Sequence, residues 1–292
     1  MLKENALRKI FITTLTMFIV LTIYTIPNTN RVLRTNLEIE DITNLSTDKI
    51  YLLNKDNYLV KTDIFIDSNK KEDKIEKIIN YLTINSNKIP SSLNGYIPKN
   101  TKLLNYDLDE GYLLLNFSKE IENTKNKELM ITGIVNSLLE LKYINKITIL
   151  IEDKQIKEYT NLDKSIGINN EYLYTNRKDI ERVVIYYLDN NNYYVPVTKY
   201  LNNKKDKIEI IIDELKNTDK NLITYIDNNI DLLDYKEEAN VLFLNFNEYL
   251  KDSNKETEEK ILNEIAYSVF DNYDVDMVNF EVNGKKLKYI ER

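Results

Sequence analysis

The chain has 292 residues, of which 42% are hydrophobic and 30% charged, with a net charge of −7 and neither cysteine nor histidine. Disulfides, metal sites built on Cys or His, and Ser-His or Cys-His nucleophile pairs are therefore excluded. Residues 1–36 hold five Lys or Arg against one acid, so the remaining chain carries −11, which argues against binding to nucleic acid. The length suggests two domains.

An uncharged run spans residues 10–26, between Lys9 and Pro27. It is at the short end for a membrane-spanning helix, and it lacks the polar stripe of an amphipathic helix. Basic residues precede it and no cleavage site follows, which favours an uncleaved signal anchor. We expect a cytoplasmic N-terminus at 1–9, a transmembrane anchor at 10–26, a polar stalk at 27–48, and extracytoplasmic C-terminal domains in the cell envelope. The anchor residues expected in lipid are Ile10, Phe11, Leu15, Phe18, Ile19, Val20, Leu21, Ile23 and Ile26.

A first domain is expected at residues 49–152. Strands are predicted at 50–54 and 58–66, and apolar residues spaced three and four apart predict a helix around 75–82. A second hairpin is predicted from 103–106 and 112–117, with its turn at 107–111. A second helix over 131–138 and an alternating strand at 147–151 complete a ββαββαβ unit.

The whole unit is repeated. Leu115-Asn116-Phe117 returns 129 positions later as Leu244-Asn245-Phe246, and the other predicted strands and helices recur in the same order with similar offsets. Duplication predicts this pattern, because strand and helix periods recur together. We therefore expect a linker at 153–182 and a second domain at 183–292. The predicted fold class is α+β, with each repeat forming a mixed or antiparallel sheet that carries two helices on one face.

Candidate chemical sites are few. Asp107, Asp109 and Glu110 form an acidic turn, but a calcium site needs more oxygen ligands, so a solvated hairpin tip is favoured. Asp109 and Glu120 could be imagined as a glycosidase pair, although the sequence gives no carboxylate separation. We predict no catalytic residue, no metal site and no cofactor, since no Gly-rich phosphate loop is present either.

Two further sets of polar side chains have both a structural and a binding interpretation. Asn116 and Ser118 follow a strand, where they could contact a partner or cap nearby backbone groups; the capping role is favoured. The tyrosines of the second copy's first hairpin suit an interface, yet tyrosine is also a good strand residue, so a structural role is favoured. These tyrosines are Tyr186, Tyr187, Tyr193 and Tyr194.

Several segments resemble the GerM domain family of sporulation and spore germination. Residues 97–104, Ile-Pro-Lys-Asn-Thr-Lys-Leu-Leu, resemble its Ile-Pro-Lys-Gly-Thr-Lys-Leu-Leu, and residues 165–169 resemble a segment that often follows the first domain. The second copy departs from the pattern, with Asp227 in place of Pro98. The positions that carry the resemblance are Pro98, Leu115, Asn116, Phe117, Ser118, Asn136, Ser137, Leu138, Leu244, Asn245, Phe246 and Gly284.

The resemblance implies a tandem pair of GerM-like domains in an extracytoplasmic protein of a Gram-positive-type bacterium. It implies a role in envelope assembly during sporulation and not in catalysis, and its likeness to ring-building modules implies homo-oligomers. The family's lipoproteins carry a lipidated cysteine that this chain lacks, so its anchor would be the helix. Expected partners are the membrane, further copies or other envelope proteins. A peptidoglycan-binding module that positions a cell-wall hydrolase is the alternative, and a peptidoglycan-cleaving enzyme is a weaker third.

Overall fold

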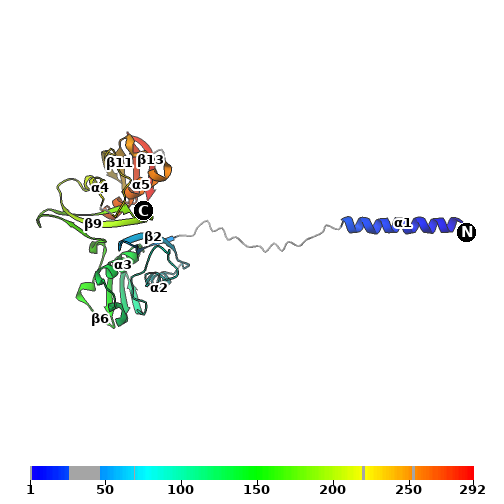
Figure 1. The fold of residues 1–292 in the computed structure, drawn as a ribbon, viewed down its shortest axis with the longest axis horizontal. Coiled ribbons are helices and arrows are strands. Elements are labelled where there is room, and N and C mark those ends of the chain that lie inside the picture. The colour runs from blue at the N-terminus through cyan, green and yellow to red at the C-terminus, as the bar shows by residue number, and fades with distance from the viewer. Residues whose placement is uncertain (1, 26–46, 69, 219–220, 252–253) are drawn as a thin grey trace. The chain divides into compact units, whose positions relative to one another are not determined.

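A computed structural model describes residues 2–25, 47–68, 70–218, 221–251 and 254–292 (Figure 1). The chain divides into two compact units, Met1–Leu45 and Ser46–Arg292. The predicted stalk and Ile26 fall almost wholly outside the described residues.

The first unit contains helix α1 (Leu2–Thr25), drawn in blue in Figure 1. Its segment Lys3–Thr22 is long and apolar enough to cross a membrane, by length and composition. The hydroxyls of Thr13, Thr14, Thr16 and Thr22 each donate to the carbonyl four residues earlier, at 2.6–3.0 Å. These bonds satisfy the hydroxyls within the helix, as a lipid surrounding requires. The predicted apolar helix is confirmed, and its described anchor side chains are exposed: Ile10, Phe11, Leu15, Phe18, Ile19, Val20 and Leu21.

The second unit contains both repeats, and the predicted element order is found in each. The first repeat comprises β1 (Thr47–Leu53), β2 (Leu59–Phe65), α2 (Lys71–Tyr81), β3 (Leu103–Asp109), β4 (Tyr112–Phe117), α3 (Lys127–Leu139), β5 (Lys146–Ile151) and β6 (Lys154–Gln155). The connecting segment adds β7 (Glu171–Leu173). The second repeat comprises β8 (Ile180–Leu188), β9 (Tyr194–Asn202), α4 (Lys207–Leu215), β10 (Leu232–Glu238), β11 (Val241–Phe246), α5 (Lys255–Asn272), β12 (Met277–Val282) and β13 (Lys285–Glu291).

The strands of one repeat divide between two sheets. One four-stranded sheet has the order β3-β4-β5-β6 and another β10-β11-β12-β13, each with a parallel pair at its centre. Hairpins β1-β2 and β8-β9 join, with β7, into one five-stranded sheet, hereafter the shared sheet. Its two halves meet where β2 pairs antiparallel with β9, at Lys61 and Tyr194.

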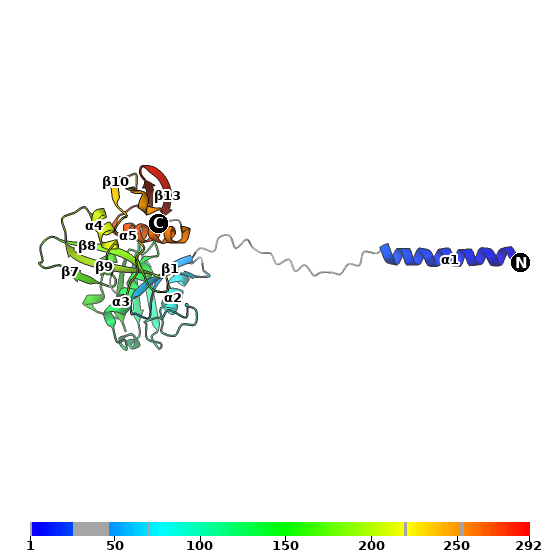
Figure 2. The ribbon, with the colours of Figure 1, turned by 45° about the horizontal axis from the view of Figure 1, so that its top comes forward.

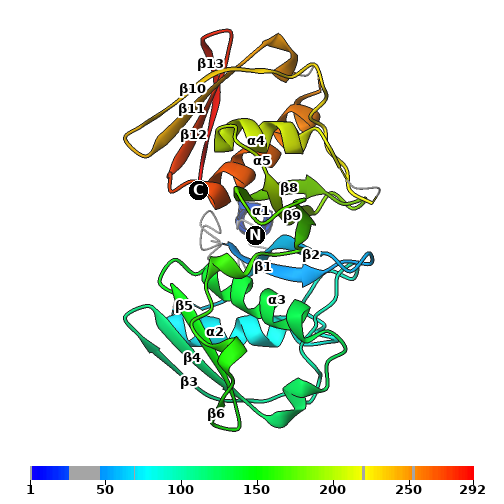
Figure 3. The same ribbon diagram turned by 90° about the vertical axis from the view of Figure 1, so that its left-hand side faces the viewer.

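The α+β class, the mixed sheets and the tandem arrangement are therefore confirmed, whereas the helices do not simply cover one face of one sheet. In Figure 3 the helices of each repeat lie between the shared sheet and an outer four-stranded sheet. The reason is visible in α3, where every residue from Met130 to Leu139 is buried. A helix that is buried all round needs partners on both sides, and two sheets supply them.

The second hairpin of the first repeat is tighter than predicted. Asp107 and Asp109 lie within β3, and only Glu110 and Gly111 form the turn, at φ of 45° and 86°. Two residues with positive φ close a two-residue hairpin whose twist matches the flanking strands. The predicted acidic turn at 107–111 is therefore mostly strand.

Two edge strands of the shared sheet, β1 and β8, are capped by side chains of the neighbouring helices. On β1, the Tyr51 N–H donates to Ser137 Oγ of α3 at 2.9 Å, and on β8 the Tyr186 N–H donates to Ser268 Oγ of α5 at 2.9 Å. Asn272 adds a bond in each direction with the backbone of Val184. The outer sheets differ, because β3, β10 and β13 are exposed edge strands.

Candidate functional site between the two repeats

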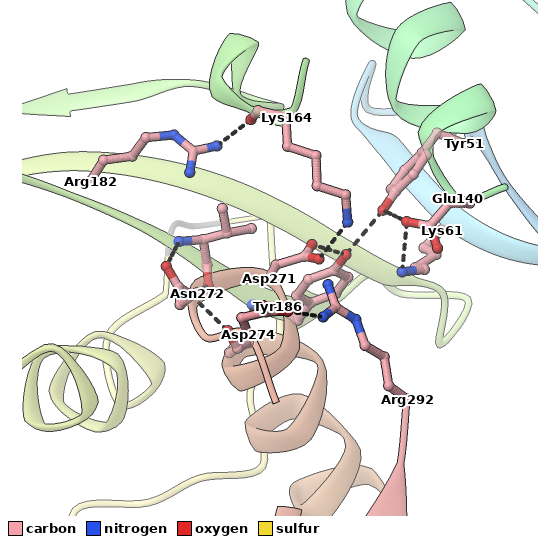
Figure 4. A network of polar contacts seen from close by, with 12 residues as sticks. Tyr51, Lys61, Glu140, Lys164, Arg182, Tyr186, Asp271, Asn272, Asp274 and Arg292 are labelled. Atoms are coloured by element: carbon pink, nitrogen blue, oxygen red, sulfur yellow. Dashed lines mark hydrogen bonds and ion pairs between the residues drawn. The ribbon is translucent and has the colours of Figure 1, made fainter. Parts of the chain in front are cut away.

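A cleft of about 940 Å³ opens where the two repeats meet. Its walls come from β1, β2 and the C-terminal ends of α3 and α5, so both repeats contribute to it. Charged side chains of both signs line it, among them Lys61, Glu140, Lys164 and Asp271. Figure 4 shows these groups converging on two tyrosines.

The tyrosine network follows the duplication. Tyr51 Oη donates to Glu140 Oε1 at 3.0 Å, and Tyr186 Oη donates to Asp271 Oδ2 at 2.7 Å. The two hydroxyls lie 3.1 Å apart (Figure 4). Tyr51 and Tyr186 occupy equivalent positions in β1 and β8, and Glu140 and Asp271 equivalent positions at the ends of α3 and α5. Each repeat thus brings one tyrosine and one carboxylate to a common centre.

Two lysines balance the carboxylates. Lys61 Nζ lies 3.0 Å from Glu140 Oε1, and Lys164 Nζ lies 3.4 Å from Asp271 Oδ1. A carboxylate at a helix C-terminus is disfavoured by the helix dipole, so a nearby cation is needed. Lys61 also lies 5.5–5.8 Å from the ring centres of Tyr51, Tyr186 and the partly buried Tyr267.

The pKa values of this network move away from neutrality. Burial acts to lower the pKa of Lys61, but Glu140 and Asp271 outweigh it and the pKa is raised. Burial acts to raise the pKa of Asp271, but Lys61, Lys164 and the Tyr186 hydroxyl outweigh it and the pKa is lowered. Burial, followed by the carboxylates, raises the pKa of Tyr51 and Tyr186 well above the usual value. Such groups hold fixed charges or stay neutral near pH 7, which suits a structural ion cluster better than proton transfer.

A second polar contact also joins equivalent residues. Asn54 Nδ2 donates to Asp189 Oδ2 at 3.0 Å, and both side chains are buried. The Oδ1 atom of each side chain accepts two backbone N–H groups in its own hairpin turn, at 2.8–3.0 Å. One pair of side chains therefore shapes both turns and connects the repeats.

The connecting segment takes part in the shared sheet through Asn169. Its Oδ1 accepts the Leu59 N–H at 3.0 Å, and its Nδ2 donates to the carbonyls of Leu59 and Pro196 at 2.9 and 2.7 Å. The side-chain amide thus bridges β2 and β9 beside their only direct residue pair. Residues 165–169, singled out by resemblance, here hold the repeats together.

The motif asparagines hold turns. Asn116 exchanges two hydrogen bonds with Asp153, at 2.7 and 3.0 Å, and fixes the turn after β5. Its counterpart Asn245 accepts the N–H of Gly284 at 2.8 Å, in the turn after β12 where Gly284 has φ of 73°. The favoured capping role agrees with this geometry.

The other motif positions are built into the scaffold. Ser118 Oγ accepts the Lys102 N–H at 3.0 Å, Ser137 caps the edge of β1, and Asn136 donates to the Thr132 carbonyl at 2.9 Å. Pro98 starts a turn closed by Thr101, and Asp227 replaces it by accepting the Asn229 N–H at 2.7 Å. The apolar motif residues are fully buried: Leu115, Phe117, Leu138, Leu244 and Phe246.

The acidic candidates are not brought together. Asp109 ends β3 beside the start of β4, whereas Glu120 lies in the 3-10 turn η1 (Lys119–Glu122) after the end of β4. A six-residue strand separates their backbones by about 20 Å, beyond the spacing of a glycosidase pair. Within the described ranges, no group of three or more acidic side chains could hold a metal ion.

The four tyrosines of the β8-β9 hairpin pack inside the second unit. Besides Tyr186, Tyr187 Oη donates to the Glu214 carbonyl at 2.7 Å and Tyr193 Oη lies 3.0 Å from Ser92 Oγ of the first repeat. The ring of Tyr194 meets Tyr267 edge to face at 4.9 Å. The favoured structural role agrees with these contacts.

The residues that sequence reasoning missed are Lys61, Glu140 and Asp271. A signal for the acids was available, because Glu140 and Asp271 lie 131 positions apart at the C-terminal ends of equivalent helices, where a carboxylate opposes the helix dipole. Nothing in the sequence pattern marks Lys61, whose partners come from other elements.

Comparison with known proteins agrees with the tandem architecture. The family described as "Germane: Sporulation and spore germination" matches residues 49–157 and 184–288. "Spore germination protein GerM" of Bacillus subtilis (strain 168) is 27% identical over 264 residues, covering 81% of this chain and 71% of the relative. A solved structure of the "Tandem GerMN domains of the sporulation protein GerM from Bacillus subtilis" superposes with a TM-score of 0.74 at 24% identity, covering 85% of this chain and 96% of that one. With both repeats matched and the same tandem fold, the chain belongs to the sporulation and spore germination (Germane) family.

Proposed function

We propose that this chain is a non-catalytic envelope assembly protein of sporulation. Helix α1 would anchor it in the cell membrane by a single span, with residues 47–292 outside the cytoplasm. It would act by binding further copies of itself or other envelope proteins. The observation that carries this proposal is the contrast between strands β1 and β8 of the shared sheet, whose edges are capped by helix side chains, and the exposed edge strands of the outer sheets.

The reasoning starts from the strand edges. An open edge presents unpaired N–H and C=O groups that can receive a strand from another chain. In the shared sheet, Ser137, Ser268 and Asn272 bond to the backbone edges of β1 and β8, which leaves the three-residue strand β7 as a short exposed edge. The exposed strands β3, β10 and β13 are left for partners. The cleft network supports a non-catalytic role, because the pKa shifts of Lys61, Asp271, Tyr51 and Tyr186 all move away from neutrality.

Site-specific photo-cross-linking in the source bacterium tests the proposal during envelope assembly. Probes placed at exposed positions of β3, β10 and β13 should capture envelope proteins or further copies of the chain. Matched probes at Lys49 and Lys164 in the cleft should capture much less. Capture from the cleft alone would contradict the proposal and indicate a ligand site between the repeats. Protease added to intact protoplasts should digest residues 47–292, and full protection would contradict the proposed topology.

A peptidoglycan-binding module that positions a cell-wall hydrolase is the second candidate. Tyr172 favours it, because this side chain is 61% exposed and its ring stacks on Tyr200 at 4.9 Å, with Tyr174 edge-on at 6.1 Å. Exposed aromatic faces with a polar tip suit recognition of mixed polar and apolar ligands. Co-sedimentation of the detergent-solubilised chain with purified sacculi tests it. Saturable pelleting that Tyr172→Ala abolishes and Tyr249→Ala preserves would support this candidate, and absence of pelleting would remove it.

A further inference from the structure

The outer sheet of the second repeat has two open edges of opposite charge. Edge strand β10, Leu-Leu-Asp-Tyr-Lys-Glu-Glu, carries three acids and one lysine. Edge strand β13, Lys-Lys-Leu-Lys-Tyr-Ile-Glu, carries three lysines and one acid. Both have seven residues, both are largely exposed, and neither pairs on its outer side with another strand of the described chain.

Charged residues and bulges on an edge strand commonly prevent aggregation, and each edge taken alone fits that role. Because the net charges of β10 and β13 have opposite signs, they also affect which edges of two chains can associate. Two β10 strands would bring together two edges that each carry more acids than lysines, and two β13 strands two edges that each carry more lysines than acids, so like pairs repel. A β10 strand beside a β13 strand would bring together edges of opposite net charge. The edges thus oppose like pairing and favour unlike pairing.

A groove beside β10 strengthens the match. A hollow of about 500 Å³ lies between α4 and β10, with Ile212, Leu232 and Leu233 among its lining residues. Its rim holds four acids and two lysines, and the lysines already pair with Asp213 and Asp231. Glu209 and Asp234 remain without a lysine partner among the described residues. The groove therefore has negative charge left to neutralise.

Strand β13 carries lysines on the side that would face such a groove. Lys285 and Lys288 pair across the sheet with Val282 and Phe280, which are buried on the helix side. Cross-strand neighbours share a face, so both lysines lie on the helix side of the sheet. On a second copy docked at β10, both would approach the α4–β10 groove, where Lys288 would exchange its ion pair with Glu259, at 3.3 Å, for the groove acids.

We propose that the β13 edge of one chain docks on the β10 edge of a second copy, with the β13 lysines against the acidic α4–β10 groove. This inference rests on the proposed function and specifies one interface for it. Because the two surfaces differ, the contact is head-to-tail and repeats from copy to copy, forming a ring if it closes and a filament if it does not. Strands β10 and β13 run in the same direction in their sheet, so copies that repeat by rotation about the strand direction would pair these strands in parallel.

The first repeat provides the control. Its strand β3 is also an acidic open edge, with Asp107 and Asp109, but its last strand β6 has only two residues before the chain turns into the connecting segment. The first repeat therefore lacks a long basic edge, and the proposed contact uses the second repeat on both sides.

The chain contains no cysteine, so single cysteines report contacts without background. Full-length chains with Lys236→Cys on β10, Tyr289→Cys on β13 or Asp107→Cys on β3 are given different tags and reconstituted in lipid vesicles, alone and in pairs. Mild oxidation should give at least about tenfold more disulfide dimer for the β10 and β13 pair than for either variant alone. Equal dimer yields in the single-variant samples, or dimers of β13 with β3 in place of β10, would overturn the proposal.

Charge reversal provides the second test. Lys285→Glu with Lys288→Glu on the β13 chain should lower the mixed dimer several-fold, and Glu209→Lys with Asp234→Lys on its partner should restore it. Failure of the second pair to restore the dimer would refute the electrostatic match. A lysine-reactive cross-linker applied to the unmodified chain separates the two proposals. Cross-linked oligomers without β10–β13 disulfides would leave assembly standing and remove this interface.

Discussion

Glu264 is expected to make the stability of the second unit depend on pH. It lies in α5 with no exposed surface, at the position that Gly133 occupies in the first repeat. At Gly133 the Tyr96 ring fills the space, since an added Cβ would meet that ring at 2.4 Å. In the second repeat the equivalent Tyr225 is only partly buried, and the Glu264 carboxyl is buried instead. Its Oε2 accepts the Tyr225 N–H at 3.2 Å, and its Oε1 has no hydrogen-bond partner among the described residues.

The magnitude follows from the pKa shift. Burial raises the pKa of Glu264 from 4.5 to about 8. The folded state therefore holds the proton more tightly than the unfolded state. Its contribution to stability is fully present below pH 4.5 and is lost as the pH rises to about 8. The slope is about 1.4 kcal/mol per pH unit, so the complete loss is about 5 kcal/mol.

Glu264→Gln removes this titration while keeping the shape of the side chain. Urea unfolding of the full chain in mild detergent, followed by far-UV circular dichroism at several pH values between about 5 and 9, measures it. As the pH rises toward 8, the free energy of unfolding of the wild type should fall more steeply than that of the variant, by about 1.4 kcal/mol per pH unit. Glu128→Gln, an exposed change in α3, should keep the wild-type slope. Parallel curves for wild type and Glu264→Gln would refute the reasoning.

Three further substitutions test the network, a turn and the anchor. Lys61→Met should destabilise the second unit by about 3–5 kcal/mol in urea unfolding, because it leaves the largely buried Glu140 carboxylate without its cation. Adding Glu140→Leu to this variant should recover much of the lost stability. If the two substitutions instead gave additive losses, the pairing of Lys61 with Glu140 would be contradicted. Gly111→Ala should lower the free energy of unfolding more than Gly284→Ala does. Both substitutions add about 1–2 kcal/mol of backbone strain at a positive φ, but a Cβ on Gly111 would also meet Asn145 Nδ2 at 2.6 Å, whereas Gly284 faces open space. Equal losses of stability would argue against the close contact at Gly111. Ile19→Arg should disfavour insertion of α1 by about 2.5–3.5 kcal/mol and move the chain toward the carbonate-extractable fraction, whereas Ile19→Leu should not; continued membrane retention of the Arg variant would count against α1 as the anchor.

Much of the fold could be predicted from local patterns. The helix faces at Ile75, Ile78 and Ile79 and at Leu262 and Ile265 are buried as their spacing predicts. Helical and strand periods depend on neighbouring residues in the chain, so they can be read without knowing the partners. The duplication was visible for the same reason, because both copies keep the same order of periods.

The sequence by itself determined the two repeats, their elements, the core residues and the apolar N-terminal helix. Only the tertiary structure decided that β2 pairs with β9, and that the first hairpins of both repeats join in one shared sheet. It also brought Tyr51, Lys61 and Glu140 of the first repeat together with Tyr186 and Asp271 of the second. The physical reason is that an alternating pattern specifies which face of a strand is buried, but not which strand pairs with its edge. The pairing of β2 with β9, and the charged groups that this pairing brings together, therefore form only when the two repeats pack against each other.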